Sequence, residues 1–263
     1  MKAYWAVISA RFRALLQYRA AAVAGFATQL FWGLIRVMIF TAFYESSTAK
    51  QPMSAEEVVT YVWLGQAFFR LLPWDIEGDI RQMIRTGDVA YELLRPLDMY
   101  WLWYCRALAW RTAPTLLRAL PLLVIALPFL GMQGPASVAS GGAFLVAMVG
   151  AVCLAAAITT LIGITLLWSI SGEGISRLVS VAVLLLSGMM LPLPLFPGWA
   201  QGIISVLPFR GVVDLPFRLY MGNLPPEQVL GVLAHQVVWI AGLAVFGRWL
   251  LGRGVRRLAV QGG

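Results

Sequence analysis

Long apolar stretches, separated by short polar or glycine- and proline-rich segments, dominate the pattern of this 263-residue chain. The clearest is residues 119–172, which are 54 consecutive positions without Asp, Glu, Lys or Arg. A helix needs about 20 apolar residues to cross a bilayer core. The pattern therefore predicts an all-α integral membrane protein. We place its six transmembrane helices at residues 20–44, 58–74, 112–130, 143–168, 175–191 and 228–247.

An amphipathic helix is expected before the first span, over residues 1–19. Apolar side chains recur there at steps of three and four, and polar side chains occupy the other side. The apolar set is Trp5, Ile8, Phe12, Leu15 and Leu16. Such a helix lies along a membrane surface rather than across it.

Two local signals refine the spans. Ser54 followed by Glu57 is the spacing of a capping box, which predicts the start of the second span. Between the fifth and sixth spans, Pro192 and Pro194 interrupt the apolar pattern, and residues 198–209 are too short to cross. We expect a re-entrant or broken element there, which needs its backbone shielded from lipid.

Charge then indicates sidedness. The chain is 60% hydrophobic and 12% charged, with a net charge of +8. Its basic residues flank apolar stretches and form no face of their own, which favours a topology signal over nucleic-acid binding. With six spans, 15 Lys and Arg residues fall on one side and three on the other, namely Lys50, Arg210 and Arg218. We expect a multi-pass protein of the cytoplasmic (inner) membrane with both termini cytoplasmic.

Residues 74–98, between the second and third spans, carry six acidic residues and three arginines, against the basic balance of the whole chain. Periodicity predicts a short helix with an apolar face that ends at Gly87. This favours a surface on which another protein docks, although a solvated loop with a Glu77–Arg81 pair is the alternative. The candidate docking residues are Ile76, Glu77, Ile80, Arg81, Ile84, Arg85, Gly87 and Asp88.

Four residues are candidates for a substrate pathway. Arg36 lies inside the first span, where a charge is costly, so it either lines a pathway or is satisfied by headgroups or backbone carbonyls. His235, in the sixth span, is either a proton carrier or, more simply, a packing residue. Pro192 and Pro194 mark an interrupted helix, which is typical of transport pathways, although a simple extracellular loop is the alternative.

The reactive groups of an enzyme are missing from the sequence. His235 is the only histidine and is followed by Gln236, so there is no HExxH motif, and no Asp or Glu lies inside a predicted span. Neither lysine follows a glycine-rich phosphate loop. We therefore expect no catalytic residues, no metal and no cofactor on this chain, and any ATP must be bound by a partner subunit.

Several motifs resemble the permease subunits of type-2 ABC transporters, the bacterial exporters of drugs, antibiotics and polysaccharides. The likeness extends over essentially the whole chain, and residues 84–97 carry its most specific part. The matching stretches are Tyr18-Arg19, Ile84-Arg85-Thr86-Gly87-Asp88, Leu93-Leu94-Arg95-Pro96-Leu97, Leu195-Phe196-Pro197-Gly198-Trp199, Leu207-Pro208-Phe209-Arg210 and Tyr220-Met221-Gly222-Asn223.

The resemblance implies a single transmembrane permease domain over residues 1–263, with a cytoplasmic coupling helix in the 74–98 segment. It also implies two ABC ATPase subunits and a second copy of this permease, or a related one, as partners within the lipid bilayer. The expected function is ATP-driven efflux of a hydrophobic or amphipathic substrate. The alternative is a stand-alone secondary carrier or channel, which should show intramembrane acids or an inverted repeat.

Overall fold

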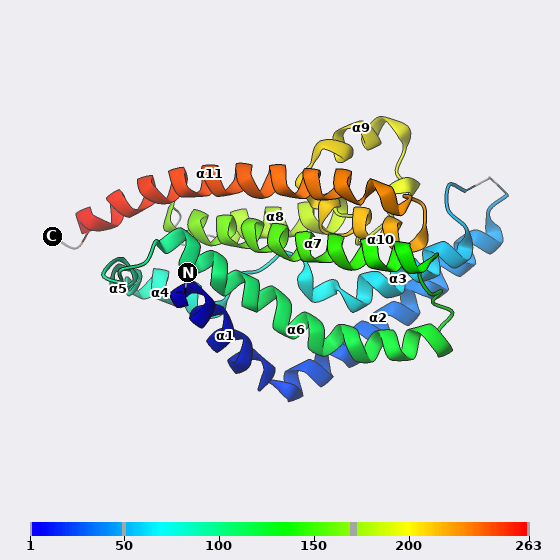
Figure 1. The fold of residues 1–263 in the computed structure, drawn as a ribbon, viewed down its shortest axis with the longest axis horizontal. Helices are drawn as coiled ribbons and strands as arrows, with labels where there is room; N and C mark the ends of the chain where they lie inside the picture. The colour runs from blue at the N-terminus through cyan, green and yellow to red at the C-terminus, as the bar shows by residue number, and fades with distance from the viewer. Residues whose placement is uncertain (1, 49–50, 169–172, 262–263) are drawn as a thin grey trace.

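The computed structural model describes residues 2–48, 51–168 and 173–261, and every regular element in these ranges is a helix. Four helices are long: α2, α6, α7 and α11 (Figure 1). In chain order the α-helices are α1 (Lys2–Leu16), α2 (Arg19–Ser46), α3 (Ala55–Ala67), α4 (Gly78–Thr86), α5 (Val89–Leu93), α6 (Met99–Phe129), α7 (Val138–Thr165), α8 (Glu173–Leu186), α9 (Gly198–Val206), α10 (Asp214–Met221) and α11 (Val229–Gln261).

The long helices correspond to the first, third, fourth and sixth predicted spans. By length and composition, Arg19–Ser46, Met99–Phe129, Val138–Trp168 and Pro226–Arg256 can each cross a membrane. The third span starts earlier than the sequence indicated, because the Asp98 carboxylate accepts a hydrogen bond from the backbone N–H of Trp101 at 3.1 Å and caps α6 there. The aromatic residues Tyr100, Trp101, Trp103 and Tyr104 therefore lie in the first turns of this helix.

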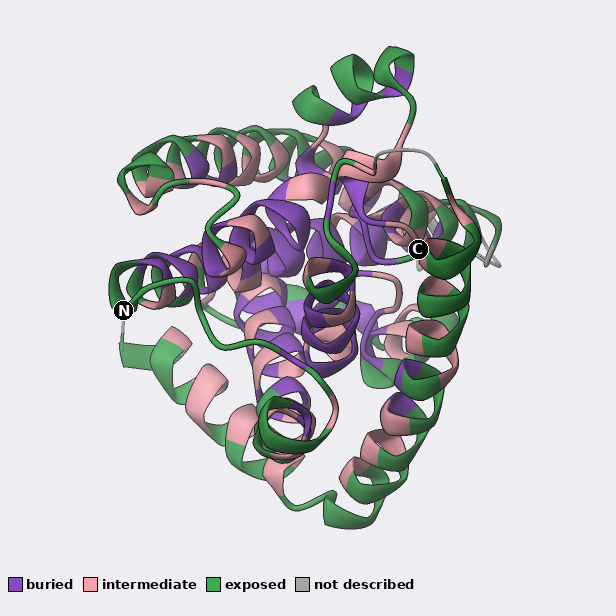
Figure 2. Cartoon of the chain, turned by 90° about the vertical axis from the view of Figure 1, so that its right-hand side faces the viewer, coloured by how far each residue is buried: buried purple, intermediate pink, exposed green. Residues whose placement is uncertain are grey.

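The other two predicted spans are shorter in the structure. Helix α3 has 13 residues and is followed by a 3-10 turn at Phe69–Leu71, and α8 has 14 residues. The capping box is confirmed: Ser54 Oγ accepts from the backbone N–H of Glu57, and Glu57 accepts from that of Ser54. Figure 2 shows the buried centre of the molecule surrounded by exposed long helices. Helix α3 belongs to that centre, since most of its residues are buried.

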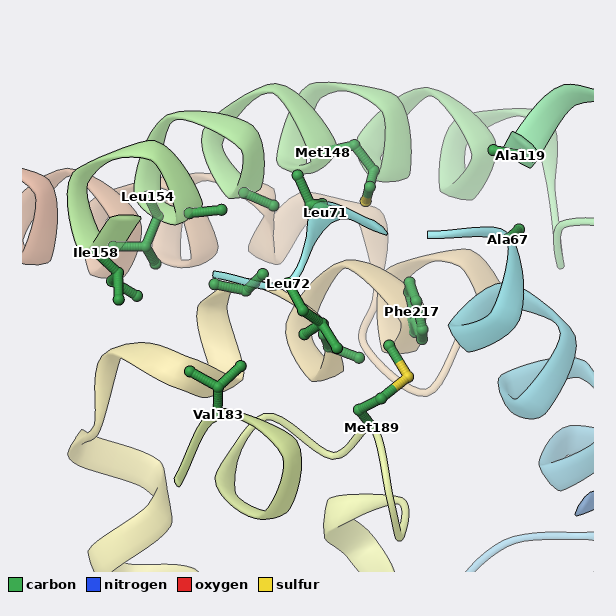
Figure 3. Packing of buried hydrophobic residues seen from close by; sticks show 14 of the residues in the cluster. Ala67, Leu71, Leu72, Ala119, Met148, Leu154, Ile158, Val183, Met189 and Phe217 are labelled. Atoms are coloured by element: carbon green, nitrogen blue, oxygen red, sulfur yellow. The ribbon is translucent and has the colours of Figure 1, made fainter. Parts of the chain in front are cut away.

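The core is built on α7, which packs against α6, α10 and α11. Its inner face carries small side chains that let neighbouring helices approach closely, including Ala147, Ala151 and Ala155. Larger side chains from other elements fill the space beside it, and Figure 3 shows Leu72, Met189 and Phe217 among them.

The chain between α8 and α11 is divided into short pieces: the 3-10 turn Leu193–Leu195, then α9, the 3-10 turn Pro208–Gly211, and α10. Helix α9 ends at Val206 because Leu207 is extended before Pro208. Figure 1 shows α9 projecting from the bundle, and Trp199 on it is 79% exposed.

Both chain ends lie toward the same end of the bundle as α4 and α5 (Figure 1). The connection between α2 and α3 lies at the opposite end, as does the one between α6 and α7. Which of these two ends faces the cytoplasm stays a prediction. Lys50, assigned to the less basic side, lies outside the described residues.

Candidate functional site

A buried ion pair anchors the 74–98 segment to α6. Nε of Arg106 lies 2.8 Å from Oε2 of Glu77, and both side chains are 7% exposed. A second guanidinium, from Arg11 of α1, lies 2.9 Å from Oε1 of Glu77 and 2.6 Å from Asp79. Glu77 is therefore committed to α1 and α6, and within the described residues Arg81, the residue of the solvated-loop alternative, is not among its ion-pair partners.

A second arginine of α6 holds the chain just before α4. The fully buried Arg111 donates from Nη1 to the carbonyl of Leu72 at 2.7 Å and from Nε to Thr159 of α7 at 2.9 Å. It also pairs with the Asp75 carboxylate at 2.7 Å, and Arg70 lies 2.9 Å from the same side chain. Burial alone would raise the pKa of Asp75, but these two guanidiniums outweigh it and hold the pKa below its usual value.

The expected docking residues divide into buried and accessible sets. Ile76, Glu77 and Ile80 are between 5% and 6% exposed and are covered by the chain itself. The side chain of Ile80 packs into the core, so its role in contacting a partner stays a prediction that the structure does not support by exposure. The residues that reach the surface are Arg81 and Ile84, which are half-buried, and Arg85, Gly87 and Asp88, which are exposed.

Two apolar side chains that the sequence did not single out extend this surface. Tyr91 and Leu94, on and after α5, are 68% and 79% exposed at the same end of the molecule as α4. The predicted stop at Gly87 is confirmed, since its φ of 82° is left-handed and ends α4. The sharp turn at Gly87 lets α5 follow directly on α4, which brings Asp88 and Tyr91 onto one surface.

A cavity of about 420 Å³ lies between α2, the end of α3, α6 and the chain after α8; we call it the α2–α8 cavity. Its walls combine aromatic and thioether groups with two arginines and two glutamines. They are Gly25, Thr28, Gln29, Trp32, Arg36, Gln66, Phe69, Trp74, Arg118, Leu184, Met189 and Met190.

Arg36 binds backbone carbonyls, as one of the two alternatives raised for it expects, and its place in a substrate pathway stays a prediction. Its Nη2 donates to the carbonyls of Met189 and Met190 at 2.6 and 2.9 Å, so backbone oxygens after α8 satisfy part of the guanidinium. The side chain also lines the α2–α8 cavity. Gln66 sits beside it and, with its amide oriented to satisfy both ends, accepts from Nη1 of Arg36 at 3.2 Å.

Arg118 enters the same cavity from α6. Gly25 makes room for it, because a Cβ at that position would overlap the guanidinium. Nη2 of Arg118 donates weakly to the carbonyl of Ala21 at 3.3 Å. Arg118 also lines a neighbouring cavity of about 410 Å³ between α1 and α6, the α1–α6 cavity, whose walls include Glu77 and Asp79.

His235 lies apart from these cavities, packed against Gly211. Its neighbour Gln236 is the more constrained residue: it is fully buried, and its Nε2 donates to the carbonyls of Ala147 and Gly211 at 2.9 and 2.8 Å. These bonds tie α11 to α7 and to the turn before α10. The geometry therefore gives α11 a polar packing residue at Gln236.

The prolines have separate positions. Pro192 is buried, whereas Pro194 lines a third cavity of about 320 Å³, the α10 cavity. Asp214 is 1% exposed in that cavity, with Arg210 and Arg218 at 4.0 and 3.9 Å from its carboxylate. The sequence placed Asp214 in an outer connection and gave no sign that it is buried.

Comparison with known families identifies the chain. A sequence model described as ABC-2 family transporter protein matches residues 26–262. The chain belongs to the ABC-2 transporter family. No curated protein and no solved structure gives a significant match.

Membership of the ABC-2 family makes this chain a permease-type membrane subunit, as the motifs indicated. In the 74–98 segment of the permease, the sequence patterns did not reveal the ion pairs that hold it to α6. Arg106 and Arg111 were not among the candidate residues, and nothing local marks them as partners of Glu77 and Asp75. The sequence feature that could have indicated these ion pairs is an acidic segment followed closely by arginines of the next helix.

Proposed function

We propose that this chain is the permease subunit of an ATP-driven exporter that moves a hydrophobic or amphipathic substrate across the cytoplasmic (inner) membrane. The ABC-2 family match carries the proposal, and that family implies association with ABC ATPase components. The energy would come from two ATPase subunits that bind ATP, while this chain supplies no catalytic residue, metal or cofactor. A second copy of this permease, or a related one, would complete the transporter.

The proposed arrangement in the membrane has six spans, with both termini cytoplasmic. Helices α2, α6, α7 and α11 would supply four spans, α3 with its 3-10 turn the second, and α8 the fifth. Helix α1 would lie at the cytoplasmic surface, and α9 and α10 would form the broken element toward the outside. The shortness of α3 is tolerable because protein rather than lipid surrounds it.

The ATPase would dock on the exposed part of the 74–98 segment, formed by Arg81, Arg85, Gly87, Asp88 and Tyr91. Movement of the docked ATPase would reach the membrane spans through buried side-chain contacts. The Glu77–Arg106 pair joins the start of α4 to α6, and the contacts of Arg111 join the preceding residues to α7. Because these side chains are buried and bonded at both ends, a displacement of α4 would be passed on to α6 and α7. A solvated loop would transmit it less well.

The first test asks whether ATP hydrolysis depends on this chain. The tagged permease is purified from its native membrane, any ABC ATPase that co-purifies is identified, and the two are reconstituted in liposomes. We expect no hydrolysis by the permease alone and stimulation of the ATPase by the permease. Transport driven by an ion gradient without ATP would instead support the carrier or channel alternative and contradict the proposal.

A second test asks whether the ATPase binds the exposed surface of the 74–98 segment. Tyr91→Asp places a charge in the proposed interface and should weaken ATPase binding about tenfold or more, since an unpaired charge buried there costs several kcal/mol. Tyr91→Phe is the matched control and should bind normally. If Tyr91→Asp retains the ATPase at normal stoichiometry, the partner docks elsewhere.

A further inference from the structure

The charges that line the α2–α8 cavity are unbalanced. Its walls include Arg36 and Arg118 but no Asp or Glu. The α1–α6 cavity has Glu77 and Asp79 in its walls, and the α10 cavity has Asp214. Among these three, only the α2–α8 cavity presents cations without a carboxylate.

The polar groups of this cavity are incompletely bonded. Within the described residues, no ion pair joins Arg36 or Arg118 to a carboxylate. Nε of Arg118 is buried without a hydrogen-bond partner among them. Gln29 is 3% exposed, and neither its side-chain oxygen nor its nitrogen has such a partner. Since burial without bonds is costly for an amide, Gln29 points to a ligand that completes it.

The arginines lie toward the two ends of the cavity. Arg118 packs at Gly25, and the Cα atoms of Gly25 and Arg36, eleven helical steps apart, are separated by about 16 Å along α2. Gln29 lies between them on the same face of α2. Arg118 also lines the α1–α6 cavity, so it lies at the border between the two cavities.

The remaining walls suit an alkyl chain. Phe69, Trp74, Leu184 and Met189 provide an apolar lining. Trp32 is 54% exposed at the outer surface of α2, so a tail can leave the cavity sideways toward the bilayer.

We propose that the α2–α8 cavity binds an amphiphile with an anionic headgroup, with Arg118 and Arg36 as successive headgroup sites and the tail along the apolar wall. The identification of this amphiphile as the substrate of the transporter rests on the proposed function. The ligand site itself depends only on the geometry of the cavity.

The test uses the purified chain in phosphatidylcholine nanodiscs, without any ATPase. Binding of a dansyl-labelled dodecyl phosphate is measured by energy transfer from tryptophan and compared with the same chain bearing a trimethylammonium headgroup. We expect the phosphate to bind at least about tenfold more tightly. Arg36→Gln and Arg118→Gln should each weaken phosphate binding by about ten- to a hundredfold, because each removes a charge-assisted contact.

Matched variants control for general effects. Arg36→Lys and Arg118→Lys keep the charge and should retain most of the affinity, and Arg13→Gln removes an exposed charge outside the cavity and should change nothing. Helical content and elution volume confirm that each variant is folded. Equal affinity for both headgroups, or wild-type phosphate binding by folded Arg-to-Gln variants, overturns the proposal.

A further arm identifies the source of the anion. If phosphatidylglycerol added to the nanodisc displaces the probe, a bilayer lipid is a natural occupant; if it does not, the site takes a non-lipid amphiphile. Either result supports an anionic headgroup site. Anion-selective binding combined with no ATPase coupling would contradict the transport function while leaving the site intact.

Discussion

The Arg106 guanidinium of α6 and the Glu77 carboxylate before α4 meet at 2.8 Å, with both side chains 7% exposed. Ion pairs this buried need their hydrogen bonds to offset desolvation, so losing Arg106 is costly even though Arg11 also lies 2.9 Å from Glu77. The pair thus makes the position of α4 depend on α6. It is a better candidate for transmitting ATPase movement than any residue on the exposed surface of α4.

Arg106→Gln should destabilise the permease by about 1–3 kcal/mol, because the buried Glu77 carboxylate loses one charge-assisted hydrogen bond and keeps Arg11, 2.9 Å away, as an ion-pair partner. The measurement is the thermal unfolding midpoint in detergent. The double variant Arg106→Gln with Glu77→Gln should recover part of this loss, since neither group is then charged. A single variant as stable as the double one would show that the pair is dispensable.

The carboxylate of Asp75 should add stability only where it is ionised. Because Arg111 and Arg70 lower its pKa in the folded state, the contribution is full above the ordinary pKa of an unfolded Asp, near 3.8, and is lost as pH falls through the lower folded value. Wild type should exceed Asp75→Asn in unfolding midpoint at neutral pH, and the difference should begin to shrink only below about pH 4 and vanish at pH values below the folded pKa. A difference that is constant with pH would assign the effect to packing rather than charge.

Local patterns predicted much of this fold. Helices α2, α7 and α11 follow from apolar length, the start of α3 from Ser54 and Glu57, and the end of α4 from Gly87. Each of these features depends on neighbours in sequence, through burial period, capping or backbone conformation.

The features that the sequence did not reveal depend on contacts between residues far apart in the chain. Ile80 has the periodicity of an exposed amphipathic helix, yet the core covers it, and periodicity alone cannot say whether a partner or the same chain covers an apolar face. Glu77 and Arg106 are 29 residues apart, so no local rule pairs them. Arg36 was a candidate because a charge inside a span is conspicuous, but its carbonyl partners lie 153 and 154 residues away.

Gly87→Ala should disturb the turn between α4 and α5, because a Cβ is disfavoured at a φ of 82°. We expect a loss of about 1–2 kcal/mol in stability together with weaker ATPase stimulation. Gly78→Ala is the matched control: it lies in α4, has no neighbour within 4 Å of an added Cβ and should be neutral or slightly stabilising. Equal effects of the two substitutions would mean that the turn geometry is unimportant.

Gly150 is required by Gln236, because a Cβ on α7 at this position would overlap the Gln236 amide. Gly150→Ala should displace that amide from the carbonyls of Ala147 and Gly211 and cost roughly 2–4 kcal/mol, from overpacking and lost hydrogen bonds. Gly142→Ala, on the same helix with open space around the added methyl, should have little effect.

A double-mutant cycle tests whether the cost passes through Gln236. In a Gln236→Ala background the overlap disappears, so Gly150→Ala should cost at least about 1 kcal/mol less than in wild type. Unfolding midpoints of the four proteins, measured in the same detergent, give the coupling energy. If Gly150→Ala is equally costly in both backgrounds, its effect comes from the backbone of α7, and Gln236 is not the contact that fixes a glycine at this position.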